Sequence, residues 1–178
     1  MAGDEAAEVE RVAFGDRAAY ARLVTIHMGP IEAYALRMSG NAATAQDVVQ
    51  EVMLRLWLKA EAFDSGKARL TTWLHQMAHN LCLDQLRREK QLTTLLDGRN
   101  DIEETLLHSD MDDDSDQVLK ALSKLPERQR NALVLTYYQG LSNAEVAEVM
   151  DLGARAVESL LVRARASLRK YLEVSDVA

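Results

Sequence analysis

Residues 140–170 constrain the fold of this chain most, because they predict a short helix, a tight turn and a second helix. Ser142 and Glu145 have the spacing of a capping box, in which each side chain pairs with a backbone N–H that the first helical turn leaves free. A helix is therefore expected to begin there and to end near Met150. A turn should follow at residues 151–153, where Asp tolerates left-handed backbone conformations and Gly adopts them without steric cost.

The second helix of this motif, expected from Ala154 or Arg155 onward, has an apolar face and a basic surface. Apolar residues recur at three- and four-residue spacing, as in a helix that buries one face: Val157, Leu160, Leu161, Ala164 and Leu168. From Leu152 to Leu172 five cations oppose a single anion, although the whole chain has a net charge of −7. A DNA major groove about 12 Å wide admits such a helix, so the motif favours DNA reading over an ordinary helical hairpin.

Acidic residues concentrate between Asp97 and Asp116, a segment that holds nine acids and one arginine. Its local charge is −8, so the rest of the chain is close to neutral at +1. Few of its residues are apolar and several form turns, a composition typical of a tether rather than of a core. We therefore expect two small helical domains, residues 1–92 and 116–178, joined by a flexible acidic linker at 93–115.

The composition indicates an all-α protein. Helix-forming residues dominate, only two prolines are present, and no alternating strand pattern of useful length occurs. The single cysteine, Cys82, excludes an intramolecular disulfide. No secretion signal is evident at the N-terminus, and the longest apolar runs are too short to cross a bilayer. A cytoplasmic protein without membrane insertion is expected, and the sequence indicates no cofactor.

Three helical patterns precede the acidic segment. The first is expected to run from a cap at Asp16 to a stop at Gly40. The second is expected to begin at Thr44, which forms a capping-box-like pair with Asp47, and to end near Ala60. The third is expected to begin at Thr71 or Thr72 and to end in a basic cluster: Arg87, Arg88 and Lys90.

A metal site is the basis of a remote enzymatic alternative. His75 and His79 are four residues apart on the third helix, a spacing that can hold a metal, and Cys82 follows one turn later. The zinc-protease pattern needs Glu where Gln76 stands, and no third ligand is evident elsewhere. Polar helix histidines and small buried cysteines are common without metal, so no metal is expected.

Three sequence runs and the helix-turn-helix stand in an order and spacing that resemble one known family. The runs are AQDVVQEVMLRLW, ARLTTWLHQMAHNLCLDQLRRE and LSKLPERQRNALVL. With the helix-turn-helix they resemble a bacterial sigma factor of the extracytoplasmic-function group, over nearly the whole chain outside the acidic segment. The resemblance implies a two-domain initiation factor, not an enzyme, that binds core RNA polymerase and directs it to promoters.

The same resemblance implies promoter DNA as a second partner, a stress regulon as the target, and an anti-sigma factor as the inhibitor. The main alternative is an interaction protein that mimics a sigma factor, sequesters its inhibitor and never binds DNA. Cations on both expected DNA surfaces argue against this alternative.

By position, four residues match the family surface that binds the polymerase clamp helices: Asp47, Gln50, Glu51 and Leu54. The three polar residues would equally suit a solvated helix face, so their polymerase role rests on the resemblance. Leu54, if exposed, is an apolar contact candidate.

The loop from Asp64 to Arg69 matches the family segment that captures an extruded base of the minus-ten promoter element. Gly66 permits close approach there, and the expected DNA contacts are Ser65, Lys67 and Arg69.

The third helix matches the family surface that faces the melted strand, through four residues: Asn80, Asp84, Arg87 and Arg88. Asn80 suits a base edge, whereas the two arginines suit the phosphate backbone. Asp84 equally suits a salt bridge to Arg87 or Arg88.

The helix-turn-helix matches the part of the family that reads the minus-thirty-five element. The resemblance assigns base-edge contacts to four residues of its second helix: Arg155, Glu158, Ser159 and Arg163. Arg128 and Arg130, in a preceding helix begun by Pro126, are expected to hold phosphates. Asp151, Arg155, Ala156 and Leu160 depart from the family pattern, so the promoter sequence preference stays open.

Overall fold

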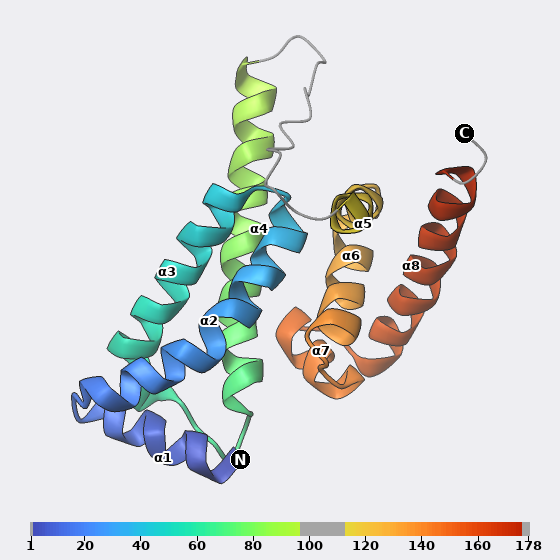
Figure 1. Cartoon of the computed structure of the whole chain (residues 1–178). Coiled ribbons are helices and arrows are strands. Elements are labelled where there is room, and N and C mark those ends of the chain that lie inside the picture. The colour runs from blue at the N-terminus through green and yellow to red at the C-terminus, as the bar shows by residue number, and fades with distance from the viewer. Residues whose placement is uncertain (1, 97–112, 176–178) are drawn as a thin grey trace.

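The computed structural model describes residues 2–96 and 113–175, and all regular secondary structure within them is helical. The first four α-helices form an N-terminal bundle: α1 Ala2–Ala13, α2 Arg17–Ser39, α3 Ala42–Lys59 and α4 Leu70–Leu96, with a short 3₁₀ turn, η1 Ala60–Ala62, after α3. The remaining helices form a C-terminal bundle: α5 Asp113–Ser123, α6 Glu127–Leu133, a π-helical turn η2 Val134–Tyr138, α7 Asn143–Met150 and α8 Ala154–Ser175. The predicted all-α fold is confirmed (Figure 1).

Helix α1 is additional to the three helices expected before the acidic segment. It contacts α2 and η1, and of its residues 4–13, whose burial is described, only Val9 and Val12 are buried. An ion pair joins Glu8 Oε2 to Arg22 Nη2 at 2.7 Å and holds α1 to α2. Two buried residues one turn apart are too few to give a convincing helical period in the sequence, which explains why α1 was not expected.

Local capping residues set the ends of α2 and α3. Asp16 accepts hydrogen bonds from the backbone N–H groups of Ala18 and Ala19, and Gly40 ends α2 in the left-handed region at φ 68°, as predicted. The start expected for α3 at Thr44 is wrong. Asn41 caps this helix by accepting from the Thr44 N–H at 3.0 Å, and Asn is as good an N-cap as Asp or Ser.

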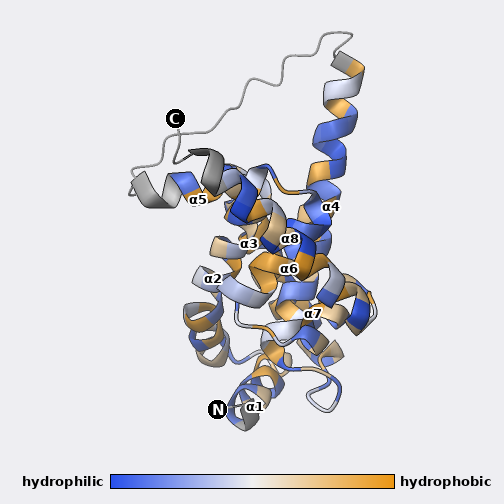
Figure 2. Cartoon of the chain, turned by 90° about the vertical axis from the view of Figure 1, so that its right-hand side faces the viewer, coloured by the Kyte–Doolittle hydropathy of each residue, from blue (hydrophilic) through white to orange (hydrophobic). Residues whose placement is uncertain are grey.

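Helix α4 begins at Leu70 and extends to Leu96, beyond the end predicted at Lys90. Its last turns project past the other helices and mix hydrophilic with hydrophobic residues (Figure 2), among them the exposed Leu92 and Leu95. Helix α5 already begins at Asp113, inside the segment expected as linker. The remainder of that linker, residues 97–112, lies outside the described residues, and the proposed domain boundaries stay predictions.

The helix-turn-helix forms as predicted. Ser142 Oγ caps α7 and Glu145 completes the capping box, while Asp151 ends the helix in the left-handed region at φ 52°. Gly153 does not need a positive φ, in contrast to its expected role. Its carbonyl instead accepts from two N–H groups in the first turn of α8.

We expect Asp151→Gly to raise the free energy of unfolding by up to about 1 kcal/mol, because Asp151 adopts a left-handed conformation that Gly adopts without a Cβ clash. Urea denaturation measures this change. Glu148→Gly, within α7, is the control and should destabilise by about 1 kcal/mol. A loss of stability on Asp151→Gly would show that the Asp side chain contributes more than its backbone strain costs.

The two bundles pack directly against one another. Helix α7 lies against the first half of α4, and α6 and η2 lie against α2 (Figure 1). The buried residues of both bundles form one continuous core. Within residues 2–96 and 113–175, no helix combines the length and apolar character needed to cross a bilayer.

Candidate functional site

Helix α3 presents a surface of mixed chemistry. Asp47, Gln50 and Leu54 are exposed, and Glu51, half-buried, forms an ion pair with Arg55 at 2.7 Å between Oε1 and Nε. The Leu54 residue is 49% exposed, as expected. The four residues assigned to polymerase binding therefore share one accessible helix face that offers carboxylate, amide and apolar contacts.

A groove of about 360 Å³ runs between this face of α3 and the middle of α4. Asp47, Glu51 and Arg55 line it from α3. Arg88 lines this groove from α4. It therefore does not lie with Asn80, Asp84 and Arg87, the residues with which the resemblance grouped it on a strand-facing surface. Since Arg87 and Arg88 are successive residues, they diverge by about 100° around the helix.

Asn80, Asp84 and Arg87 form a separate exposed line on α4, at three- and four-residue spacing. Asp84 Oδ1 lies 3.5 Å from Arg87 Nη1, so the salt-bridge interpretation of Asp84 is confirmed. The pair is well exposed, so water and salt screen it and a phosphate can displace the carboxylate from the guanidinium.

The loop between η1 and α4 is organised by Asp64. Its Oδ1 accepts the Gly66 N–H at 2.9 Å, and its Oδ2 lies 3.3 Å from Lys67 Nζ. A Cβ on Gly66 would lie only 3.2 Å from Asp64 Oδ1, so Gly suits this turn. Ser65 and Lys67 are exposed at its tip.

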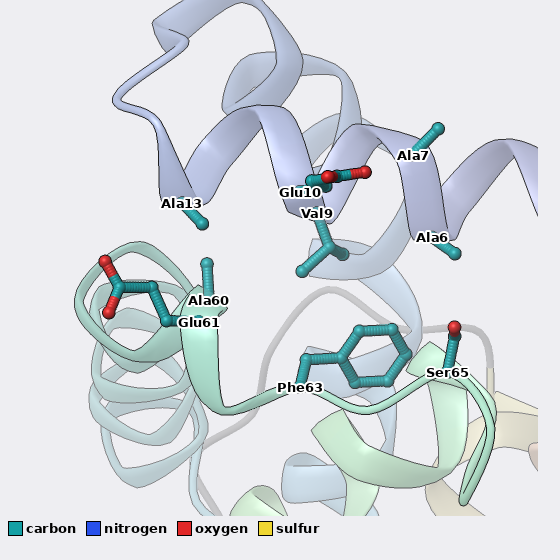
Figure 3. Close-up of a pocket in the computed structure, with 9 residues that line it drawn as sticks. All are labelled: Ala6, Ala7, Val9, Glu10, Ala13, Ala60, Glu61, Phe63 and Ser65. Carbon is teal, nitrogen blue, oxygen red and sulfur yellow. The ribbon is translucent and has the colours of Figure 1, made fainter.

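A cavity of about 480 Å³ opens between this loop and α1. Figure 3 shows Val9 on α1 facing Phe63 on the loop, with Ser65 beside the Phe63 ring. The Phe63 ring also contacts the Trp73 ring, at 5.3 Å between ring centroids. The cavity escaped sequence reasoning because α1, one of its walls, was not expected.

Helix α8 buries Val157, Leu161 and Ala164 against its own bundle and turns a second face outward. This outer face holds the four residues assigned to base reading: Arg155, Glu158 and Arg163, all exposed, and Ser159, half-buried. Ser159 Oγ accepts from Arg163 Nη2 at 2.9 Å. The outer face also contains Val162, which is 60% exposed and which the sequence assignment omitted.

The two arginines of α6 have different environments. Arg128 is exposed and accessible to a phosphate. Arg130 points into the junction of the bundles, where its Nη1 donates to the Met38 carbonyl at 2.8 Å. Burial lowers the pKa of Arg130. In this arrangement the Arg130 guanidinium forms a hydrogen bond between the bundles and does not lie on an outer surface.

The histidines of the metal alternative are both buried at the junction and paired with protein groups. His75 Nδ1 lies 2.8 Å from the Thr71 carbonyl oxygen, and its Nε2 lies 3.2 Å from Gln139 Oε1. Asn131 Nδ2 donates to His79 Nδ1 at 2.6 Å. Throughout the described ranges, no three His, Cys, Asp or Glu residues group closely enough to hold a metal ion.

A basic helix-turn-helix joined to a helical bundle with an accessible polar face is the architecture of a DNA-binding transcription factor. Comparison with known families narrows the class: residues 23–91 match the model described as Sigma-70 region 2, and residues 115–168 match Sigma-70, region 4. The chain belongs to the sigma-70 family of RNA polymerase sigma factors, in the extracytoplasmic-function group. Sigma factors bind core RNA polymerase and direct promoter-specific initiation, and they are initiation factors rather than classical enzymes.

Individual relatives match this chain over nearly the full length of both sequences. The chain is 34% identical to the RNA polymerase sigma factor NccH of Alcaligenes xylosoxydans xylosoxydans, over 94% of each chain. It is 28% identical to the ECF sigma factor SigW of Bacillus subtilis, over 92% of this chain and 94% of SigW. Among solved structures, CnrH in complex with the cytosolic domain of CnrY is similar with a TM-score of 0.74 and 26% identity, over 96% of this chain and 97% of CnrH.

Proposed function

We propose that the N-terminal bundle binds the polymerase and the minus-ten element, while the C-terminal bundle reads the minus-thirty-five element through α8. The outer face of α8 carries this proposal. Its arginines and its acidic and hydroxyl groups are accessible and are the kinds of donor and acceptor that a second helix of a helix-turn-helix offers to base edges, while its inner face buries Val157, Leu161 and Ala164. Arg128 adds a phosphate contact from α6.

Polymerase binding is proposed for the α3 face and the adjoining groove. Asp47 and Glu51 supply negative charge, Gln50 a hydrogen-bonding amide, and Leu54 an apolar contact that water exclusion would strengthen. Leu58, one turn further along α3, is 67% exposed and extends the apolar part of this surface. The groove gives a partner helix a place to lie between α3 and α4.

The cavity beside Phe63 and Ser65 is the proposed receptor for an unstacked base of the minus-ten strand. An aromatic wall and a hydroxyl group suit stacking and hydrogen bonding to a base. Lys67 and Arg69 can neutralise the flanking phosphates, and the line of Asn80, Asp84 and Arg87 continues the path along α4.

Regulation by an anti-sigma factor in the cytoplasm completes the proposal. A solved structural neighbour, RpoE, was crystallised with the anti-sigma factor NepR from Bartonella quintana, and it shares this fold with a TM-score of 0.73 at 24% identity. CnrH was likewise solved with the cytosolic domain of CnrY. We propose a partner of the same type for this chain, acting in response to stress.

In vitro transcription with core polymerase and a library of promoter fragments tests the proposal. Sequence-selective starts that require the purified chain are expected. Binding to core polymerase without starts on any fragment would contradict the promoter assignment and favour a sigma mimic.

Replacing Arg163 by Ala should cost about 1–3 kcal/mol in binding to a selected minus-thirty-five sequence and less on a scrambled one, because a base contact discriminates and a phosphate contact does not. Fluorescence anisotropy on both duplexes measures the difference. Arg128→Ala is the matched control and should weaken binding to both duplexes equally. Equal losses for Arg163→Ala would remove Arg163 from base reading.

A further inference from the structure

The seam between the bundles is lined by polar side chains from one face of α4. Thr72, His75 and His79 occupy successive turns of this helix, and all three are buried by the C-terminal bundle. Each has a hydrogen-bonding partner across the seam: Glu145, Gln139 and Asn131, respectively. The seam is therefore a specific interface with matched polar groups, rather than a nonspecific contact of two apolar patches.

Glu145 has two functions at this seam. Its Oε2 accepts from the Ser142 N–H at 2.8 Å and so completes the capping box of the helix-turn-helix. Its Oε1 accepts from Thr72 Oγ1 at 3.2 Å and from Arg69 Nη1 at 3.3 Å. One carboxylate thereby ties the DNA-reading motif of the C-terminal bundle to the minus-ten loop of the N-terminal bundle.

Arg69 is a cation that the proposed function assigns to a promoter phosphate. A carboxylate and a phosphate present similar anionic oxygens to a guanidinium, so both compete for the same donor. While Glu145 is in place, Arg69 is partly neutralised, although 64% of its side chain remains accessible. The ion pair is exposed enough to be exchanged rather than permanently held.

With its two bundles packed together, an arrangement called closed below, the chain is also too short to span both promoter elements. A compact chain of 178 residues has a radius of gyration of about 16 Å and is about 40 Å across. Elements at minus ten and minus thirty-five, about 25 base pairs apart, are separated by about 85 Å along B-DNA. With α7 against α4, both readers cannot occupy their elements at once. The bundles must separate first.

We propose that Glu145 is a latch that holds the chain closed by occupying, on Arg69, the place of a promoter phosphate, so that promoter binding requires its release. This inference rests on the proposed function for the assignment of Arg69. Residues 97–112 connect the bundles, and a chain of that length reaches at most about 55 Å, which permits separation without unfolding either bundle.

Glu145→Gln is the sharpest test, because Gln also completes a capping box and so removes the charge while retaining the helix cap. Glu148→Gln is the matched control: Glu148 lies on the same helix, is exposed, and undergoes the same change of charge. Donor and acceptor dyes on Ala62→Cys and Ala166→Cys report the distance between the bundles by energy transfer. Cys82 should not react, since it is buried and burial raises its pKa to about 12.

We expect Glu145→Gln to raise the ratio of open to closed chain about twofold to fivefold, the range for an exposed ion pair. Affinity for a fluorescent oligothymidine should rise by the same factor when the closed state predominates, because apparent affinity scales with the competent fraction. Glu148→Gln should change neither readout. Arg69→Gln should open the chain equally without the gain in DNA affinity.

Unchanged energy transfer and unchanged DNA affinity in Glu145→Gln would overturn the latch, as would equal effects of Glu145→Gln and Glu148→Gln. Energy transfer is read on the free chain, without polymerase or promoter. It therefore stays informative if the transcription test fails, and the failure of the proposed function can be told from the failure of the latch.

Discussion

Replacing Asn131 by Ala is expected to lower the free energy of unfolding by about 3 kcal/mol, because the buried Tyr34 hydroxyl and the buried His79 ring each lose their shortest hydrogen bond. Asn131 is 1% exposed and connects three helices. Its Oδ1 accepts from Tyr34 Oη at 2.9 Å, and its Nδ2 donates to His79 Nδ1 at 2.6 Å. Tyr34 is fully buried, so water does not replace the lost bond without a rearrangement of the core.

Urea denaturation followed by tryptophan fluorescence measures the loss, since Trp57 and Trp73 both lie in the N-terminal bundle. Asn143→Ala is the matched control; this Asn is exposed in the first turn of α7 and its loss should cost less than about 0.5 kcal/mol. Combining Asn131→Ala with Tyr34→Phe should cost less than the sum of the two single changes. Strict additivity would show that the observed hydrogen bond contributes nothing to stability.

Local signals in the sequence predicted local structure well. Asp16, Gly40 and the Ser142–Glu145 box each act within one turn of the chain, so their effect is readable without knowledge of the fold. The outward face of α8 was predictable for the same reason, because helical periodicity alone separates Val157 and Leu161 from the exposed positions.

The junction of the two bundles was not predictable in this way. His79 and Asn131 lie 45 and 97 positions from Tyr34 in the sequence. No periodicity pairs a phenol, an imidazole and an amide over such separations. His75 and His79 suggested a metal site because only their mutual spacing is visible in the sequence. Their partners on α6 and after η2 come from the other bundle.

The polar character of the junction fits a contact that forms and separates. Interfaces between domains resemble transient protein interfaces and are more polar than a domain core. When the bundles separate, Thr72, His75 and His79 can form hydrogen bonds to water, whereas an equally large apolar seam would expose surface at a high cost. Matched polar groups also fix one closed arrangement, because an unpaired buried group is costly in any other.

Acidification is expected to destabilise the chain as the pH falls from 6.5 toward 4, with His79 as the largest resolved contributor. Burial, opposed by the nearby Glu127 and reinforced by Arg87, lowers the pKa of His79 from 6.5 to about 4. The neutral ring accepts from Asn131 through Nδ1, which a protonated ring cannot do. The unfolded chain therefore binds more protons than the folded chain below pH 6.5.

The contribution of neutral His79 to the free energy of unfolding is fully present above pH 6.5 and is lost as the pH falls through about 4. The difference between the two pKa values corresponds to about 3 kcal/mol. Urea denaturation at a series of pH values measures the loss. His79→Gln retains an acceptor for Asn131 without titrating, so its stability should depend less on pH over this interval. Burial also lowers the pKa of His27 and His75, which account for the dependence that remains. An identical pH profile in His79→Gln and the original chain would contradict the role of His79, because the acid sensitivity would then belong to those other groups.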